Sequence, residues 1–180
     1  GIRDIVKIEP LAIDPANHEL ILDIATEALD SLQKMRKEEG INLQKDLERR
    51  IDTIESHAAE IESWHPEVLK EYQNKLKERI KSLNEGMESD ETRIAQETAL
   101  LADRCDITEE ITRLKSHLNQ FKKFFNPNEP IGRKLEFITQ EINREVNTIG
   151  SKSSNIKISN RVIEIKSELE KIREQVQNIE

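Results

Sequence analysis

Carboxylate, amide and cationic side chains gather between Gly132 and Lys152, in the segment GRKLEFITQEINREVNTIGSK. Glu141 and Glu145 lie four residues apart, so a helix places both on one face, where like charges repel. A nearby basic side chain or a divalent metal would relieve that repulsion. Oxygen ligands alone suit Mg²⁺ or Mn²⁺ better than zinc. The spacing leaves two interpretations open: a metal site, or a solvated or salt-bridged face.

A helix over residues 133–149 sorts its side chains into three stripes, because successive residues turn by about 100°. The apolar stripe is Leu135, Ile138, Ile142, Val146 and Ile149; the charged stripe is Lys134, Phe137, Glu141, Arg144, Glu145 and Thr148; the amide stripe is Glu136, Gln140, Asn143 and Asn147. Asn and Thr are mediocre helix formers, so this segment gives up helix propensity for hydrogen-bonding capacity. We therefore expect the functional site here.

The preceding segment adds three chemically active side chains on one helical face: Glu110, Arg113 and His117. Histidine transfers protons near neutral pH, which makes His117 a candidate acid or base. A partly buried, hydrogen-bonded histidine is the alternative. Asp106 and Glu109 are most simply helix caps. Glu110 has no capping role and is therefore the better candidate metal ligand.

Basic side chains in the same half of the chain are candidates for binding phosphate, since the guanidinium fork matches phosphate oxygens. They are Arg113, Arg133, Lys134, Arg144, Lys152 and Arg173. Asn147 can add hydrogen bonds beside them. The turn GSKSS offers hydroxyls and backbone N–H groups to an anion. It lacks the strand and spaced glycines of a Walker motif.

Composition predicts a helical protein. The 180 residues are 35% hydrophobic and 36% charged, with only five Gly, five Pro and six aromatic residues. The net charge of −8 lies entirely in residues 1–90, whereas residues 91–180 are neutral, so a polyanion would approach the second half. The single cysteine, Cys105, excludes an internal disulfide. Without a signal peptide or an apolar run of membrane-spanning length, we expect a cytoplasmic protein that does not enter the membrane.

Periodicity predicts the arrangement of the helices. A helix begins near Asp14-Pro15 and reaches Gly40, which either breaks it or is absorbed into one long helix. A heptad seam then runs from Leu47 to Ile61. His65-Pro66 should end that helix and begin another, which makes a long antiparallel hairpin. After it we expect helices at 91–104, from Asp106 to Phe125, at 133–149, and along a last seam from Ile158 to Ile179. The prediction is an all-α fold, with a lead-in and hairpin over 1–90 and a compact C-terminal bundle over 91–180.

The motifs in the second half resemble the C-terminal domain of the YicC/YloC family of bacterial endoribonucleases. The resemblance covers residues 99–180 and rests on LADRCDITEEITRLKSHLNQF, GRKLEFITQEINREVNTIGSKS and IKSELEKIREQVQNIE in that order. It implies cytoplasmic RNA cleavage aided by a divalent metal, in a ring-like homo-oligomer. The β-rich N-terminal part of that family has no counterpart in this chain.

The functional hypothesis is a metal-dependent endoribonuclease acting in RNA turnover. Glu141, Glu145 and Glu110 would hold Mg²⁺ or Mn²⁺, with His117 as proton donor or acceptor. A variant scheme has His117 acting on the 2′-OH without a metal. Arg113, Arg133, Lys134, Arg144, Asn147 and Lys152 would bind the RNA. The alternatives are a structural coiled-coil or adaptor protein, and an oligomer that binds RNA without cutting it.

Overall fold

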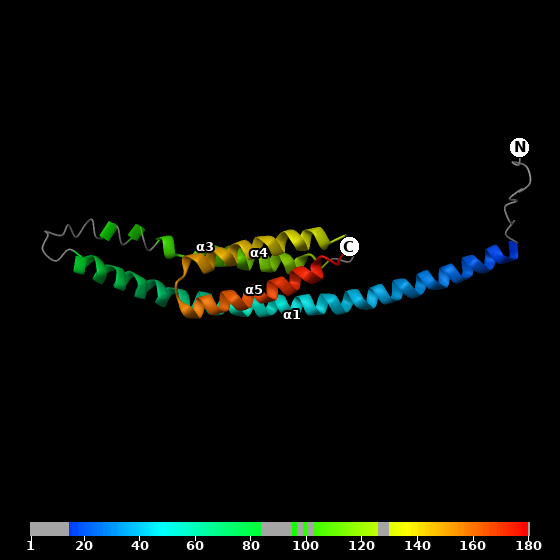
Figure 1. The fold of residues 1–180 in the computed structure, drawn as a ribbon, viewed down its shortest axis with the longest axis horizontal. Helices are drawn as coiled ribbons and strands as arrows, with labels where there is room; N and C mark the ends of the chain where they lie inside the picture. Colours follow the sequence, from blue (N-terminus) through cyan, green and yellow to red (C-terminus); the bar gives the residue numbers. More distant parts are fainter. Residues whose placement is uncertain (1–14, 84–94, 97–98, 101–102, 126–129, 180) are drawn as a thin grey trace, which may run out of the picture. The chain divides into compact units, whose positions relative to one another are not determined.

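The computed structural model describes residues 15–83, 95–96, 99–100, 103–125 and 130–179. Its main elements are helices α1 (Pro15–Leu83), α3 (Thr108–Lys123), α4 (Gly132–Lys152) and α5 (Ile156–Val176) (Figure 1). Over these described ranges the chain contains helices and turns but no strand, which confirms the all-α prediction. Most of the predicted helix at 91–104 lies outside them.

Contacts divide the chain into two compact units, residues 1–43 and 44–180, and each is described by itself. In the first unit, the described turns of α1 leave large apolar side chains in solvent, among them Leu20, Ile24 and Leu29. The second unit contains the core. The predicted domains at 1–90 and 91–180 stay a prediction, because contact clustering does not show which segments fold alone.

Helix α1 is continuous from Pro15 to Leu83, so the predicted break at His65-Pro66 and the hairpin built on it are wrong. A proline inside a helix loses one backbone hydrogen bond and costs about 3 kcal/mol. Packing around the proline offsets that cost. Ile61 is fully buried one turn earlier, and His65 is buried and bound to Asp106, whereas the ring of Pro66 is exposed. Gly40 is likewise absorbed into the helix.

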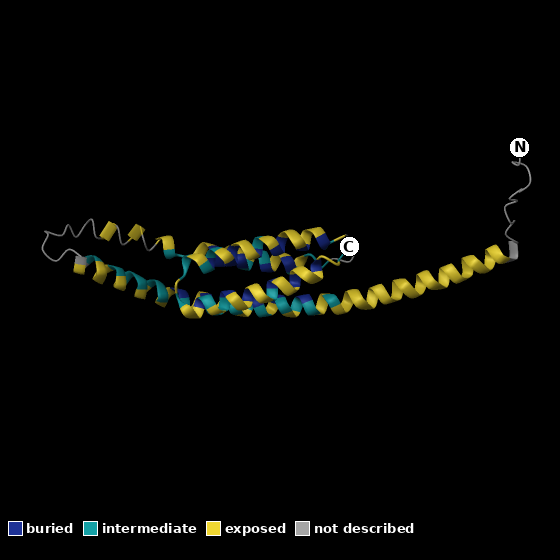
Figure 2. Ribbon diagram, viewed as in Figure 1, coloured by how far each residue is buried: buried dark blue, intermediate teal, exposed yellow. Residues whose placement is uncertain are grey.

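The heptad seams form the core of the second unit, as their spacing predicts (Figure 2). The α1 seam of Leu47, Ile51, Ile54, Ala58 and Ile61 is fully buried. The α5 seam from Ile158 to Val176 is buried at every position. Phe121 of α3 is also fully buried, and its ring meets Phe125 edge-on at 5.6 Å. These aromatic rings pack against each other within the fold.

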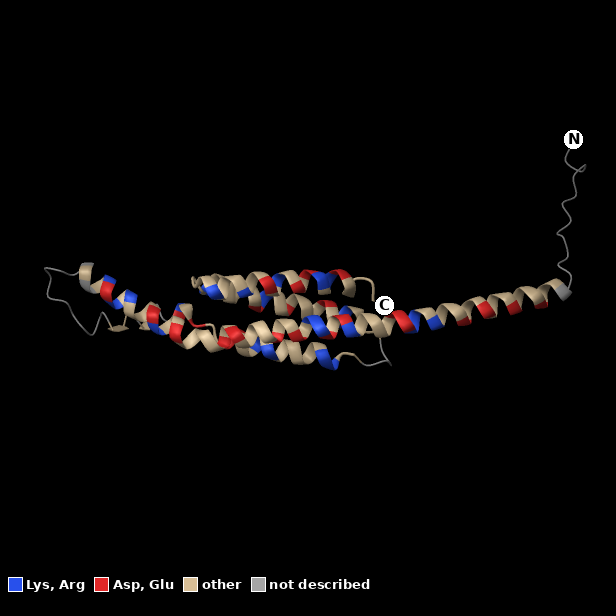
Figure 3. Ribbon diagram, turned by 90° about the horizontal axis from the view of Figure 1, so that it is seen from below, with Lys and Arg blue, Asp and Glu red and all other residues tan. Residues whose placement is uncertain are grey.

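Ion pairs tie α1 to α3 and α5, and they draw on the acidic and basic residues that Figure 3 colours along α1. Arg50 donates to Glu168 of α5 at 2.9 Å, and Arg161 of α5 donates to Glu60 at 2.6 Å. Lys122 of α3 lies 2.7 Å from Glu55 of α1. Most of these side chains are partly exposed, so each pair contributes about 1 kcal/mol or less. The buried seams therefore hold the bundle, and the ion pairs fix its register.

Helix α4 packs between α3 and α5. Two glycines allow close approach on its α5 side. A Cβ on Gly132 would lie 2.3 Å from the carbonyl oxygen of Ile179, and one on Gly150 would lie 3.0 Å from a Val162 methyl carbon. Helix α4 extends to Lys152, so the predicted loop 150–155 shrinks to three residues. Asn155 then caps α5 by accepting the backbone N–H of Lys157 at 2.9 Å.

Candidate functional site: the seam between α3 and α4

The three predicted stripes of α4 reach three different environments. Its apolar stripe is buried in the core. Glu145 of the charged stripe contacts α3, as does Lys152 at the end of α4, and the amide stripe lines a groove shared with α5. Helix α4 therefore has two polar faces of different chemistry, one on each side of its buried apolar stripe.

At one end of the α3–α4 seam, Glu110 and Lys152 form an ion pair. Lys152 Nζ donates to Glu110 Oε1 at 2.7 Å and to the backbone oxygen of Asp106 at 3.0 Å. The Glu110 side chain is buried, and its second oxygen, Oε2, has no hydrogen-bond partner. The pair occupies Lys152 and one oxygen of Glu110, which leaves Lys152 little capacity to bind phosphate and offsets the Glu110 charge that would attract a metal. The same contact therefore weakens both predicted roles.

Farther along the seam, Arg113 and Glu145 face each other. Arg113 Nη1 lies 3.9 Å from Glu145 Oε1, and the same guanidinium also donates to Glu109 on its own helix. Glu145 is 5% exposed. Since α3 and α4 run antiparallel, the Arg113–Glu145 contact sets their register, and His117, one turn on along α3, lies level with Glu141, one turn back along α4. The Arg113–Glu145 contact is observed directly, and the place of His117 beside Glu141 follows from this helical register.

His117 carries an unsatisfied nitrogen within that segment. Its Nδ1 atom is buried and has no hydrogen-bond partner among the described residues. Buried polar atoms are nearly always paired, so an unpaired ring nitrogen in a row of charged side chains needs an explanation. Because this atom is closed to solvent, a substrate hydroxyl reaches it only if the half-buried ring turns. The expectation of an internally hydrogen-bonded, inert histidine does not describe His117 Nδ1.

The remaining predicted RNA contacts lie on open surface. Arg133, Lys134, Arg144 and Asn147 are all exposed on α4. Arg144 shares the charged stripe with Glu141 and Glu145, whereas Asn147 lines the groove on the α5 side. Arg144 is therefore the predicted cation best placed beside the seam, and Asn147 belongs to a different face.

The carboxylates do not assemble a metal centre by themselves. Across the described ranges, no group of three or more His, Cys, Asp or Glu side chains is arranged to hold an ion. Glu110 is compensated by Lys152, and Glu145 faces Arg113. A three-carboxylate site of Glu110, Glu141 and Glu145 does not fit this arrangement.

Sequence reasoning missed the role of His65, which links α1 to the start of α3. Its Nε2 lies 2.9 Å from Asp106 Oδ1, which also accepts from the hydroxyl and backbone N–H of Thr108 at 2.6 and 2.9 Å. The hydroxyl of Thr108, its backbone N–H and His65 together lower the pKa of Asp106 to about 2, against the opposing effect of partial burial. Asp106 accepts the backbone N–H of Thr108, the first residue of α3, but the N-cap position is Ile107 and no side chain caps it, so the predicted capping box does not form. The contact with Asp106 was missed because the pair His65-Pro66 was interpreted as the start of a helix.

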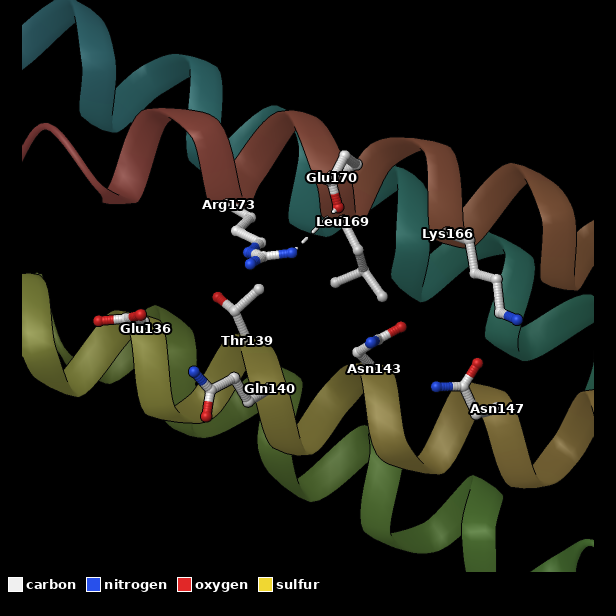
Figure 4. Close-up of a pocket in the computed structure, with 9 residues that line it drawn as sticks. All are labelled: Glu136, Thr139, Gln140, Asn143, Asn147, Lys166, Leu169, Glu170 and Arg173. Carbon is white, nitrogen blue, oxygen red and sulfur yellow. Dashed lines mark ion pairs between the residues drawn. The ribbon is translucent and has the colours of Figure 1, made fainter.

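The second polar face of α4 borders a groove of about 500 Å³ (Figure 4). Thr139 and Leu169 form its buried floor. The other lining residues are exposed: Glu136, Gln140, Asn143 and Asn147 from α4, and Lys166, Glu170 and Arg173 from α5. The sequence singled out the α4 amides and Arg173, but nothing in it placed them together with Lys166.

The fold and the site define a class of protein. It is a helical bundle in which α4 carries an acid–base seam on one face and an amide-lined groove on the other. A family model described as "Endoribonuclease YicC-like, C-terminal" matches residues 61–180. The chain belongs to this YicC-like family, as the sequence motifs predicted.

Two curated relatives extend the likeness. A protein of Clostridioides difficile named probable endoribonuclease YicC is 50% identical over 179 residues, which are 98% of this chain and 61% of that protein. A protein of the same name from Haemophilus influenzae is 34% identical over 176 residues, or 98% of this chain and 60% of that protein. The chain thus spans about three fifths of the length of these relatives. None of the described helices is long and apolar enough to cross a membrane.

Proposed function

We propose that the protein cleaves RNA phosphodiester bonds and that the α3–α4 seam carries the chemistry. The feature that supports this most is the half-buried His117 of α3, which the antiparallel register places level with Glu141, one turn from the Arg113–Glu145 contact. The names of the relatives supply the substrate class. An imidazole near carboxylates and arginines is suited to proton transfer beside a phosphate.

In the proposed reaction, His117 accepts the proton of a ribose 2′-OH. The freed oxygen attacks the adjacent phosphorus, and the bond from phosphorus to the 5′-oxygen breaks. Water donates a proton to that oxygen, which gives a 2′,3′-cyclic phosphate and a 5′-hydroxyl, and the hydroxide that remains takes the proton back from His117. Glu141 stabilises the imidazolium that forms, and Arg144 and Arg133 offset charge on the phosphate in the transition state.

Metal dependence is a separate proposal. Mg²⁺ often uses one or two carboxylates together with water and substrate phosphates, so Glu141 and Glu145 could take part without Glu110. A bound metal would supply charge neutralisation at the phosphate. Cleavage that survives complete metal removal by EDTA would eliminate this proposal and leave the histidine scheme intact.

The decisive experiment compares His117→Ala with His57→Ala in the full-length protein. His57 is a half-buried histidine of α1 whose Nδ1 also has no hydrogen-bond partner and lies 3.9 Å from Glu60, so it is a matched control outside the seam. We expect His117→Ala to slow cleavage of a single-stranded RNA by about 10²–10⁴-fold, the usual contribution of a general base, while His57→Ala has little effect. Equal rates in the two variants, at unchanged helix content, would overturn the assignment of His117.

The carboxylates are tested by replacing Glu141 and Glu145 together with Gln. Cleavage at the wild-type rate would remove both from the proposed site. Loss of assembly by light scattering, with loss of cleavage, would instead favour a structural role for the polar helix. The same measurement tests the proposed homo-oligomer, which together with a cytoplasmic role in RNA turnover comes from the family resemblance.

A further inference from the structure

We infer that the groove between α4 and α5 is a subsite for single-stranded RNA, in which amides of α4 contact adenine edges and cations of α5 contact phosphates. This inference rests on the proposed function for its substrate, but it concerns a different face of α4. The groove contains none of the residues assigned to proton transfer.

The α4 wall of the groove is a row of side-chain amides. Gln140, Asn143 and Asn147 recur at the spacing of one helical face, and none of these amides makes a hydrogen bond to any described residue. Asn143 and Asn147 point into the space between the two helices (Figure 4). An amide offers one donor and one acceptor side by side, which matches the N6 and N7 edge of adenine.

The α5 wall of the groove supplies positive charge at two points, Lys166 and Arg173. Lys166 and Arg173 lie seven residues apart, about 10 Å along the helix, which corresponds to about three stacked nucleotides. Figure 4 shows Lys166 near Asn147 and Arg173 across from Thr139, so the two cations flank the amide row. Arg173 also pairs with Glu170 at 3.8 Å, a contact exposed enough to exchange for a phosphate.

Shape and charge favour a single strand over a duplex. The floor made by Thr139 and Leu169 is aliphatic and lies between the polar walls, which suits the face of an unstacked base. Glu136 and Glu170 balance the two cations, so the groove has no net positive charge. Binding here must therefore draw on base contacts as well as on phosphate attraction, which predicts a preference among bases.

The test measures binding of fluorescent 2′-O-methyl 12-mers of A, U and C to the full-length protein by anisotropy. The blocked 2′-oxygen cannot attack phosphorus, so binding is read independently of the proposed reaction. We expect oligo-A to bind most tightly. Asn143→Ala with Asn147→Ala should weaken oligo-A binding by about fivefold or more and reduce its advantage over oligo-U. The matched control is Asn119→Ala with Gln120→Ala, two exposed amides of α3, which should leave binding unchanged.

A second pair of variants tests the α5 wall. Lys166→Met with Arg173→Met should weaken all three oligomers alike and lower the slope of log Kobs against log salt by about 1.4, or about 0.7 per lost phosphate contact. Lys70→Met with Lys77→Met, two exposed lysines of α1, should leave the slope unchanged.

Several outcomes would overturn the inference. One is unchanged binding in both groove variants while the wild-type protein still cleaves RNA; that result would leave the proposed function standing. Another is a change of oligomeric state in the groove variants without loss of RNA affinity, which would make the groove an interface between copies. Binding with the expected preferences but no cleavage of unmodified RNA would support the groove and refute the proposed function.

Discussion

The two polar faces of α4 differ in how their charges are satisfied. On the α3 side, carboxylates and cations meet in pairs, and Glu110 and Glu145 are buried. On the α5 side, amides and cations stand open to solvent around a groove. The first arrangement holds proton-transfer groups in fixed positions, and the second leaves hydrogen-bonding groups available to a ligand. The difference shows that the residues of a polar helix do not share one role merely because they share a segment.

The largest expected effect comes from breaking the buried pair of the α3 side. Lys152→Met leaves the Glu110 carboxylate buried without its cation, which should lower the free energy of unfolding by on the order of 3 kcal/mol. Thermal or urea unfolding measures this loss. The exposed pair of the groove is the control: Glu170→Gln should change stability by less than about 1 kcal/mol.

A double variant tests the reason for that loss. Glu110→Gln added to Lys152→Met removes the uncompensated charge and should recover part of the stability. If Lys152→Met lowers the free energy of unfolding no more than Glu170→Gln does, the ion pairs of the two faces do not differ in strength as proposed.

A medium effect is expected where α4 approaches the end of the chain on its α5 side. Gly132→Ala places a Cβ 2.3 Å from the Ile179 carbonyl oxygen, so backbone must shift, at a cost of about 1–3 kcal/mol. Gly40→Ala is the matched control, because nothing lies within 4 Å of its Cβ, and it should stabilise α1 by about 0.5–1 kcal/mol. Urea unfolding measures both, and a change of the same sign in the two variants would contradict the close approach.

The smallest expected effect is the pH dependence of stability contributed by Asp106, which lies just before α3. The pKa of Asp106 falls from 3.8 to about 2 on folding, so this carboxylate stabilises the protein above pH 4 and loses that contribution as the pH falls from about 4 toward 2. Asp106→Asn should therefore be less stable than the wild type at pH 6, and the difference should shrink below pH 4. A difference that is constant between pH 2 and 6 would show that Asp106 does not titrate as described. Because its side chain is partly exposed, the total effect is modest.

Local periodicity predicted the helices and the core well. The seams of α1 and α5 are buried at the positions that their four-three spacing indicates, because that spacing alone decides which side of a helix is apolar. The break at Pro66 was wrong because tertiary contacts of Ile61 and His65 outweigh the local cost of a proline. Sequence spacing carries no information about such contacts.

The candidate site was predictable in location but not in pairing. Spacing placed Glu141 and Glu145 on one face of one helix, yet it could not show that Arg113 of α3 reaches Glu145 or that Lys152 occupies Glu110. Those contacts depend on the register between two helices, which no residue pattern within either helix sets. The groove was missed for the same reason, because no pattern within α5 shows that Lys166 lies near Asn147 of α4.

The single tryptophan of the chain gives the bundle a built-in optical probe. Trp64 of α1 lies under the guanidinium of Arg161 on α5, 5.8 Å from the ring centre. Any event that separates these two helices removes that cation from the indole and wets the ring, which shifts the emission spectrum. The variants described above can thus be followed in solution without a dye, and RNA binding that loosens or tightens the bundle would be visible in the same signal.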